Sequence, residues 1–478
     1  MFLRAIEDPI LAQVSYLIGC QATGEAILVD PERDIDRYLR IAHRNGLRIT
    51  AVTETHVHAD FLSGCRQLAG TTGATPMLSC CGGPQWQPTW PREDGVEPRW
   101  LSDGDVVMIG NIRLKVHHVP GHTPEHIMFE VTDTASGEDS MGLLSGDFVF
   151  VGALGRPDLL EAAVGVEGAM EPSARQLAGS ARSFLEFMDH LQVWPAHGAG
   201  SACGKSLGAV PSSTVGYEKR HNTGLQLSTQ EDRFVDFILD GQPAPPLYFA
   251  RMKSQNISGP PMLSQLPSVP LMGIDDARRL DAGDVVIIDC RSWPRFRDGH
   301  LPGSIWCGFG PNLAAISGSY VEPGQSIVLI CEPGLCEEAT RVLCRIGLDG
   351  VVGACTPSEL ESAGHDALAR SREIDVQTMQ RLIGEGSSIV LDVRRADEHA
   401  AGHIAGSINI PHTRLGAHLD QLPKDRTLLV HCAAGIRSAH ALSMLERAGF
   451  NGTSLAGGIQ HWIQQGGAVE VPASSMTT

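Results

Sequence analysis

Two histidines and an aspartate stand at alternate positions in one short stretch of the chain, Glu54-Thr55-His56-Val57-His58-Ala59-Asp60. An apolar, β-branched run over 47–52 precedes them and predicts a buried strand that ends in a loop. Side chains at positions i and i+2 of an extended segment point to the same side, so His56 and His58 can converge on one point. Imidazole and carboxylate groups at this spacing are typical metal ligands, so the stretch predicts a metal site.

Further polar residues follow other expected strands in the same part of the chain. A strand over 112–116 leads to His122, a strand over 141–146 leads to Asp147, and a short strand over 193–196 ends at His197. Strand ends are the usual place for a metal site on a sheet scaffold. These three residues are therefore further candidates for the site.

The segment before the first cluster has its own regular pattern. Alternating apolar residues on either side of the turn 21–24 predict a β-hairpin over 13–30. A helix is expected next, with Asp34 as its N-cap and Gly46 just after its end.

A second candidate site lies near the C-terminus, where the chain reads His431-Cys432-Ala433-Ala434-Gly435-Ile436-Arg437-Ser438. A predicted strand ends at Cys432, and the small residues after it allow the loop to curl around the sulfur. Backbone N–H groups and a helix N-terminus would then point at Cys432, and Arg437 would add positive charge. These features favour thiolate over thiol, which is the reactive form.

The C-terminal half contains a tandem repeat. Asp289-Cys290-Arg291 recurs as Asp392-Val393-Arg394, 103 residues later, and Cys331 precedes Cys432 by 101 residues. Alternating strands and helices around each cysteine predict two small parallel-sheet domains.

The middle copy departs from the pattern because its loop reads Cys331-Glu332-Pro333-Gly334-Leu335-Cys336-Glu337-Glu338. Cys336 replaces the arginine, and three acids raise the expected pKa of Cys331. We expect a degenerate domain that acts as a spacer or interface. A redox pair of Cys331 and Cys336 is the alternative, which a strained five-residue loop disfavours.

Composition limits the possible functions. The 478 residues carry a formal net charge of −18, so the surface should bind neither nucleic acid nor an anionic membrane. The N-terminus does not resemble a secretory peptide, and the twelve cysteines show no paired CxxC spacing, so a cytoplasmic protein is expected. The expected domains are 1–240, a proline-rich linker or strap over 241–273, and small domains over 274–356 and 374–470.

The ordered histidines and aspartates of the first half resemble the metallo-β-lactamase superfamily. Members with two metals carry a histidine directly after the aspartate of the first motif, where this chain has Phe61. An apolar ring cannot bind a metal, so one metal is expected. Two histidines and one carboxylate with open positions suit non-haem Fe(II) and O₂.

Within the superfamily, the chain is most similar to persulfide dioxygenases, whose Thr-His-x-His-Ala-Asp motif it matches at 55–60. The resemblance implies one Fe(II) per chain, no organic cofactor, and three ligands, namely His56, His122 and Asp147. It also implies three neighbouring residues that orient the site without binding iron, namely His58, Asp60 and His197.

Other residues of this half fit the same resemblance. Arg156 would line the pocket, and Cys203 is either a thiol that acts near the metal or a small buried side chain. Tyr217, Lys219 and Arg220 either bind the carboxylates of a thiol carrier or form a solvated helix start.

The last hundred or so residues resemble the rhodanese family of sulfurtransferases. The resemblance implies that Cys432 carries a persulfide and that Arg437 supports it. Phosphatases of similar design have a loop that is longer by one residue, so the five residues between Cys432 and Ser438 favour sulfur.

These features predict an α/β protein in which an αββα metallo-β-lactamase sandwich is followed by two small parallel-sheet α/β rhodanese domains. The expected function is oxidation of a glutathione-type or coenzyme A-type persulfide by O₂ to sulfite, followed by transfer of sulfur from Cys432 to give thiosulfate. A homo-oligomer, either a dimer or a tetramer, is expected. The alternatives are a metal-dependent thioester hydrolase of the glyoxalase II type and a non-enzymatic sulfur carrier.

Overall fold

The computed structural model describes residues 1–163, 165–205, 207–267, 269–280, 285–362, 364 and 367–471. The chain divides into two compact units. The first comprises Met1–Leu266 and Cys344–Gly347, and the second comprises Pro267–Leu343 and Leu348–Thr478. None of the helices in the described part of the chain combines the length and apolar composition that a membrane crossing requires.

Two six-stranded sheets form the centre of the first unit. Ile112, Leu114 and Val116 alternate along β8 with more exposed residues, and they join Ile27 and Ala51 of the other sheet in one apolar core. The first sheet has the order β1 (Phe2–Asp8), β2 (Gln13–Cys20), β3 (Glu25–Val29), β4 (Arg48–Thr53), β5 (Thr75–Ser79) and β6 (Arg99–Leu101). The second has the order β14 (Ser213–Thr214), β13 (Gln192–Pro195), β10 (Gly142–Gly146), β9 (Ile127–Asp133), β8 (Ile112–His118) and β7 (Val106–Ile109).

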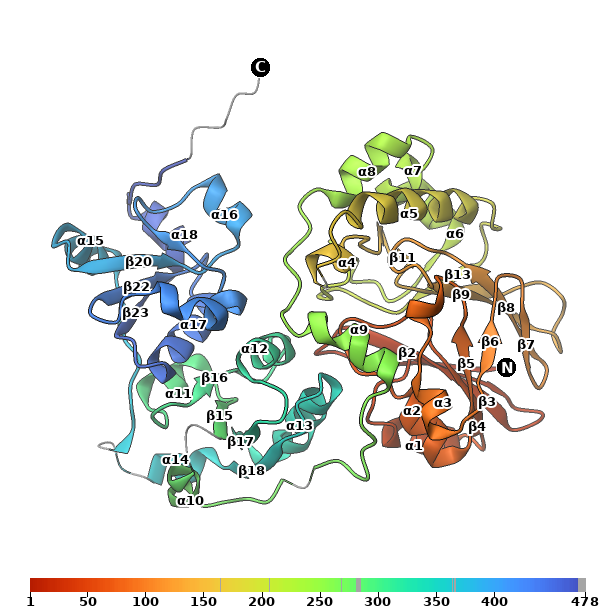
Figure 1. Cartoon of the computed structure of the whole chain (residues 1–478), viewed down its shortest axis with the longest axis horizontal. Helices are drawn as coiled ribbons and strands as arrows, with labels where there is room; N and C mark the ends of the chain where they lie inside the picture. The colour runs from red at the N-terminus through yellow and green to blue at the C-terminus, as the bar shows by residue number, and fades with distance from the viewer. Residues whose placement is uncertain are drawn as a thin grey trace. The chain divides into compact units, whose positions relative to one another are not determined.

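Helices cover the outer face of each sheet, as Figure 1 shows for the first unit. Tyr38 and Leu68 pack against the first sheet, and Leu177 and Phe234 pack against the second. The resulting αββα order confirms the expected fold of this part of the chain. The helices and minor strands are α1 (Asp36–Arg44), α2 (Cys65–Thr72), η1 (Pro84–Trp86), α3 (Trp90–Asp94), β11 (Val149–Phe150), β12 (Ala153–Leu154), α4 (Leu159–Ala162), α5 (Met170–Phe184), α6 (Val215–His221), α7 (Thr223–Leu227) and α8 (Glu231–Leu239).

The local predictions near the N-terminus are confirmed except for one cap. β2 and β3 pair as the expected antiparallel hairpin, and Gly46 has the left-handed φ of +66° just after α1. The expected N-cap at Asp34 is wrong, because α1 begins at Asp36 and no side chain caps it. The Asp34 carboxylate instead accepts two hydrogen bonds from the Arg345 guanidinium, at 2.8 and 3.0 Å.

Part of the proline-rich segment 241–273 is helical. α9 (Phe249–Ser258) buries Phe249, Met252 and Asn256, and the first unit extends through Leu266. Asn256 donates to the carbonyls of His58 and Phe61, at 2.8 and 2.9 Å. This segment therefore braces the loop that carries the first histidines.

In the described residues of the second unit the strands form two sheets, and every pair of neighbouring strands is parallel. One has the order β16 (Ile305–Trp306), β15 (Val285–Asp289), β17 (Ser326–Ile330) and β18 (Val351–Cys355). The other has the order β19 (Glu373–Ile374), β23 (Gly452–Leu455), β22 (Thr427–His431), β20 (Ser388–Asp392) and β21 (Ile408–Asn409). The helices along this part of the chain are α10 (Ile274–Arg279), α11 (Trp293–Asp298), α12 (Leu313–Tyr320), η2 (Pro333–Leu335), α13 (Cys336–Arg345), α14 (Pro357–Ser362), α15 (Val376–Gly384), α16 (Ala396–Ala401), η4 (His412–Gln421), α17 (Ile436–Arg447) and α18 (Gly458–Gln464).

The tandem repeat is visible in side-chain geometry as well as in topology. Arg291 pairs with Asp289 at 2.6 Å and donates to the Gly299 carbonyl at 2.8 Å. Arg394 makes the same two bonds at the same distances, to Asp392 and to the Gly402 carbonyl. The two modules are therefore copies of one design.

The hydroxyl of Tyr16 provides a test of how the two large sheets are held together. It donates to the Pro195 carbonyl at 2.8 Å, which joins β2 of one sheet to β13 of the other. Tyr16→Phe should lower the free energy of unfolding of the first unit by about 1–3 kcal/mol, because a buried carbonyl loses its donor. Urea denaturation measures this change. Tyr217→Phe is the control, since Tyr217 is exposed, and equal midpoints for the two variants would contradict the prediction.

Candidate functional site

The structure brings together the residues that the sequence places at strand ends in the first unit. His56 follows β4, His122 lies between β8 and β9, Asp147 lies between β10 and β11, and His197 follows β13. All four side chains are buried.

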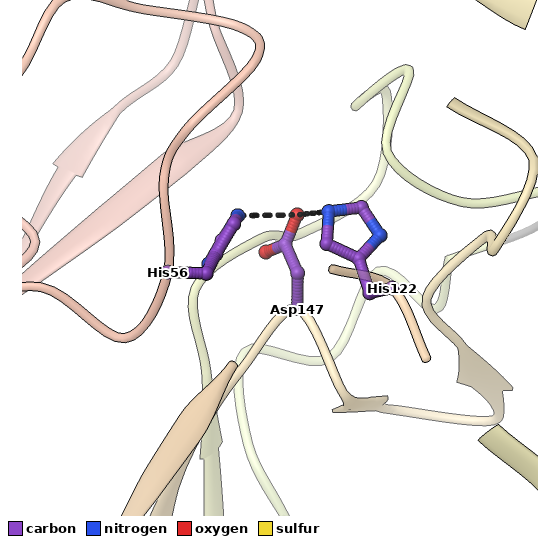
Figure 2. Close-up of side chains that lie close together, drawn as sticks. All are labelled: His56, His122 and Asp147. Carbon is purple, nitrogen blue, oxygen red and sulfur yellow. Dashed lines mark ion pairs between the residues drawn. The ribbon is translucent and has the colours of Figure 1, made fainter. Parts of the chain in front are cut away.

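His56, His122 and Asp147 form the tighter part of this cluster, which Figure 2 shows. The Asp147 Oδ2 atom lies 3.7 Å from His56 Nε2 and 3.4 Å from His122 Nε2. One nitrogen or oxygen of each residue lies within 4.8 Å of the others, so a single cation can be bound by all three.

A chain of hydrogen bonds sets the orientation of His56. The Thr55 hydroxyl donates to Asp30 at 2.9 Å and therefore accepts from His56 Nδ1 at 3.0 Å. The other oxygen of Asp30 lies 3.1 Å from His58 Nε2. Burial lowers the pKa of His58, but the charge and hydrogen bond of Asp30 outweigh it and raise the pKa to about 9. His58 thus lies in a network that orients His56.

Backbone carbonyls orient the other two imidazoles. His122 Nδ1 donates to the Arg156 carbonyl at 2.8 Å, and His197 Nδ1 donates to the Ala12 carbonyl at 3.0 Å. In each ring the proton is therefore on Nδ1, which leaves the Nε2 lone pair free for a metal.

Buried atoms without partners supply the test of whether these residues fit a metal. Among the described residues, His56 Nε2, His197 Nε2 and both oxygens of Asp60 and Asp147 are buried with no hydrogen-bond partner. Unpaired buried polar groups are costly, and a bound cation would satisfy them. Burial also lowers the pKa of His122 to about 4, which keeps its imidazole neutral as metal binding requires. The donor set therefore fits a metal ion.

A second group of possible ligands adjoins the first. Asp60 Oδ2 lies 3.2 Å from His197 Nε2, and Cys203 Sγ belongs to the same group, with ligand atoms within 4.8 Å of one another. The structure therefore places Asp60 beside His197, and it places Cys203 in the group that adjoins the three expected ligands. Burial, followed by the charges of Asp60 and Asp147, raises the pKa of the Cys203 thiol.

Phe61 is fully buried, and its ring centroid lies 4.3 Å from that of His58. No metal ligand is therefore available at this position, as the sequence indicates.

Three acidic or imidazole side chains that support the site were missed from the sequence. Asp30 joins Thr55 to His58, and Glu125 accepts from the backbone of Val57 at 2.7 Å. The backbone N–H of Asp147 donates to His126 at 3.0 Å. Asp30 directly follows β3, so the strand-end pattern could have identified it.

A small apolar cavity of about 20 Å³ adjoins His122. A volume of this size holds about one water-sized molecule, so the bulk of any larger substrate must lie outside it. The residues that line it include Trp86, Phe249 and Lys253, and the Lys253 ammonium lies 3.6 Å from the centroid of the Trp86 ring. No pattern in the sequence singles out this lysine, which lies in the segment interpreted as a linker or strap.

The expected substrate-binding residues do not line this cavity. The guanidinium of Arg156 is buried and pairs with Asp158 at 2.6 and 2.8 Å, so the structure does not support a substrate-binding role for it. Lys219 pairs with Asp189 at 2.8 Å, and Tyr217 lines a different cavity. Arg220 is exposed on the same helix, α6.

In the last module, Cys432 lies directly between β22 and the loop that precedes α17. The backbone N–H of Gly435 donates to Cys432 Sγ at 3.1 Å, and Sγ lies 3.6 Å from the Ser438 hydroxyl. Gly435 has a φ of +112°, which only glycine adopts without strain. The loop therefore curls around the sulfur as expected. The Arg437 guanidinium pairs with both oxygens of Glu398, at 2.5 and 2.8 Å.

The corresponding loop of the middle module differs from the preferred interpretation. The structure joins Cys331 and Cys336 in a disulfide, with their Cα atoms 6.0 Å apart. This separation is within the usual range for disulfides, so the strain argument against the redox pair was wrong. The 3₁₀ turn η2 folds the chain back between the two cysteines.

The bond between Thr55 and His56 can be tested by its effect on metal affinity. Thr55→Val removes the hydroxyl that links His56 to Asp30, and it should weaken metal binding about 10–100-fold. Competition with a chelator at fixed pH measures the affinity. Thr53→Val is the matched control, because the Thr53 hydroxyl is also buried on this segment but bonds to the Met77 carbonyl, at 2.6 Å. Equal affinities for wild type and Thr55→Val would contradict the role of the hydrogen-bond chain.

Comparison with known proteins agrees with this geometry. Residues 9–196 match the Metallo-beta-lactamase superfamily, and residues 277–353 and 375–465 each match the Rhodanese-like domain. The solved structure of a metallo-beta-lactamase from Staphylococcus aureus subsp. aureus COL is 39% identical and covers 74% of this chain and 99% of its own, with a TM-score of 0.66.

Two curated relatives match about half of this chain. The persulfide dioxygenase ETHE1 of Bos taurus is 25% identical over 48% of this chain and 78% of its own length. A hydroxyacylglutathione hydrolase of Polaromonas sp. is 30% identical over 45% of this chain and 81% of its own length. Together with the fold and the buried ligand group, these matches show that the chain belongs to the metallo-beta-lactamase superfamily and carries two rhodanese-like domains after its metallo-beta-lactamase domain.

Proposed function

We propose that the chain oxidises a low-molecular-weight persulfide with O₂ at a non-haem Fe(II) site and converts the product to thiosulfate at Cys432. The observation that carries the first part is the group of two histidines and one carboxylate, His56, His122 and Asp147, with buried ligand atoms that lack partners. Fe(II) held by such a group would supply the activation of O₂. The bovine persulfide dioxygenase among the relatives supports the same assignment.

The residues around the ligands would position the substrate and limit water. Val57, Leu159 and Phe249 give the cavity beside His122 an apolar wall. Oxidation of the terminal sulfur of RSSH consumes O₂ and water and gives RSH, sulfite and protons. Cys203 lies in the adjoining group with Asp60 and His197, and its thiol interacts with Asp147, so it would lie beside a substrate sulfur at this site.

Sulfite would be consumed in the last module. A Cys432 persulfide transfers its outer sulfur to sulfite, the S–S bond breaks, and Cys432 leaves as the thiolate. The N–H of Gly435 that points at Cys432 Sγ stabilises this leaving thiolate. Placing both sites on one chain raises the effective concentration of the second site.

The two alternative functions are less well supported. A thioester hydrolase of the glyoxalase II type would use a second metal, but Phe61 replaces one of its ligands and His58 Nε2 already bonds to Asp30. A non-enzymatic sulfur carrier would leave the buried ligand atoms of the first unit unpaired. A cytoplasmic location, a homo-oligomeric state and the glutathione or coenzyme A carrier remain predictions from the sequence.

Product analysis of Cys432→Ser tests whether the oxygenase step and the sulfurtransferase step occur at separate sites. The Fe(II)-loaded variant should consume O₂ from glutathione persulfide at the wild-type rate, and sulfite should accumulate in place of thiosulfate because the carrier thiol is absent. Cys80→Ser is the control, since Cys80 is a half-buried cysteine of the first unit. Wild-type thiosulfate formation by Cys432→Ser would refute the sulfurtransferase step, and a wild type that consumes no O₂ would refute the oxygenase step.

Lys253 provides a test of substrate binding. Burial lowers the pKa of its ammonium and Glu125 opposes that shift, and the group lies at the cavity beside His122. Lys253→Ala should raise KM for an anionic persulfide about tenfold, which corresponds to about 1.4 kcal/mol, with little change in kcat.

Lys253→Arg keeps the charge and is the matched control, which should retain most of the affinity. The difference between the alanine and arginine variants should shrink at high salt if the contact is electrostatic. A fall in kcat with unchanged KM in Lys253→Ala would contradict a binding role.

A further inference from the structure

The middle rhodanese-like module keeps the sulfur-carrying position of its copy and adds a second thiol. Cys331 follows β17 as Cys432 follows β22, and Cys336 occupies the position of Arg437, because both pairs are 101 residues apart. In the last module the fifth residue after the cysteine is therefore an arginine, whose guanidinium pairs with Glu398. In the middle module a persulfide on Cys331 would face a cysteine.

The loop geometry allows these two sulfurs to react with each other. Their Cα atoms lie 6.0 Å apart, and the structure contains the disulfide between them. Cys336 is the first residue of α13, so the start of this helix holds its sulfur next to Cys331. The Cys336 sulfur can therefore reach Cys331 through movement of this loop alone.

Small molecules can approach the turn between the two cysteines. Both sulfur-bearing residues are buried, but Glu332, Pro333 and Gly334 are exposed. Glu332 and Leu335 line a cavity of about 570 Å³, within the usual size of small-ligand sites. Ile436, from the loop that holds Cys432, lines the same cavity. A small persulfide that enters this cavity comes close to both loops.

We propose that Cys331 and Cys336 form a reversible dithiol–disulfide pair that a low-molecular-weight persulfide oxidises, with release of hydrogen sulfide. The Cys331 thiolate first attacks the outer sulfur of RSSH, and RSH leaves with the proton. Cys336 then attacks the sulfur of Cys331, the bond to the outer sulfur breaks, and that sulfur leaves as hydrogen sulfide. In total, two cysteine thiols and RSSH give the disulfide, RSH and H₂S. The two thiols supply the two electrons that reduce the outer sulfur.

This reaction shares its substrate class with the proposed function but uses neither the metal site nor Cys432. The two modules would then treat one substrate differently. The last module would keep the outer sulfur for transfer to sulfite. The middle module would release it as hydrogen sulfide and would be left with a disulfide between Cys331 and Cys336.

The test uses the full-length wild-type chain, reduced and desalted, with glutathione persulfide under anaerobic conditions. The absence of O₂ prevents the proposed oxygenase reaction. The result of this experiment therefore does not depend on whether the oxygenase proposal is correct. Mass spectrometry of the peptide that contains both cysteines should show loss of the free thiols and formation of the 331–336 disulfide, together with H₂S release. Persulfidation of Cys432 in the same digest reports separately on the sulfurtransferase site.

Cys336→Ser should stop the reaction at a Cys331 persulfide that the wild type does not accumulate. Cys331→Ser should form neither the disulfide nor a persulfide at Cys336. Cys355→Ser is the matched control, because Cys355 is another buried cysteine of this module, and it should form the disulfide as the wild type does. The proposal is overturned if the wild-type pair stays reduced, or if the wild type accumulates as much Cys331 persulfide as Cys336→Ser. The wild-type result decides the matter even if a variant fails to fold.

Discussion

The metal site depends on a single constraint, which is the direction of three imidazole lone pairs. His56, His122 and His197 each donate from Nδ1 to an oxygen fixed by the fold, and each Nε2 faces the buried carboxylates of Asp147 or Asp60. Buried nitrogens and oxygens that face one another without protons between them would be strongly destabilising in an apolar interior. The surrounding sheets and hydrogen bonds hold them in this arrangement, and a cation is what makes it favourable.

The sequence predicted the residues of the site better than their partners. The strand-end pattern located His56, His122, Asp147 and His197 because it is local, whereas the αββα order was predicted from the resemblance to the metallo-β-lactamase superfamily. The partner of His58 could not be predicted in this way, since Asp30 is 28 residues away and meets it only through sheet pairing. Arg156 shows the opposite problem, because its charge is visible in the sequence but its ion pair with Asp158 is not.

The two rhodanese-like modules show how one backbone design can support different chemistry. Their Asp–Arg pairs and parallel sheets agree in detail. The loops differ at the residue five positions after the cysteine, which is Arg437 in one and Cys336 in the other. The sequence showed this difference, but a count of loop residues could not show that η2 bends the chain enough to bring the sulfurs together. The contact between the sulfurs of Cys331 and Cys336, although these residues are close in sequence, could therefore be found only from the structure.

The carbonyl of Ala12 that accepts from His197 has a consequence for biosynthesis. The metal site draws on a residue at the start of the chain and on Cys203, with both sheets between them in sequence. No shorter N-terminal piece can assemble the complete set of ligands and acceptors. During synthesis the three proposed ligands are all present only once Asp147 has been added, and the carbonyl that orients His122 is present only once Arg156 has been added. The Cys432 loop, built from consecutive residues between β22 and α17, has no such dependence on distant segments for its own N–H contact.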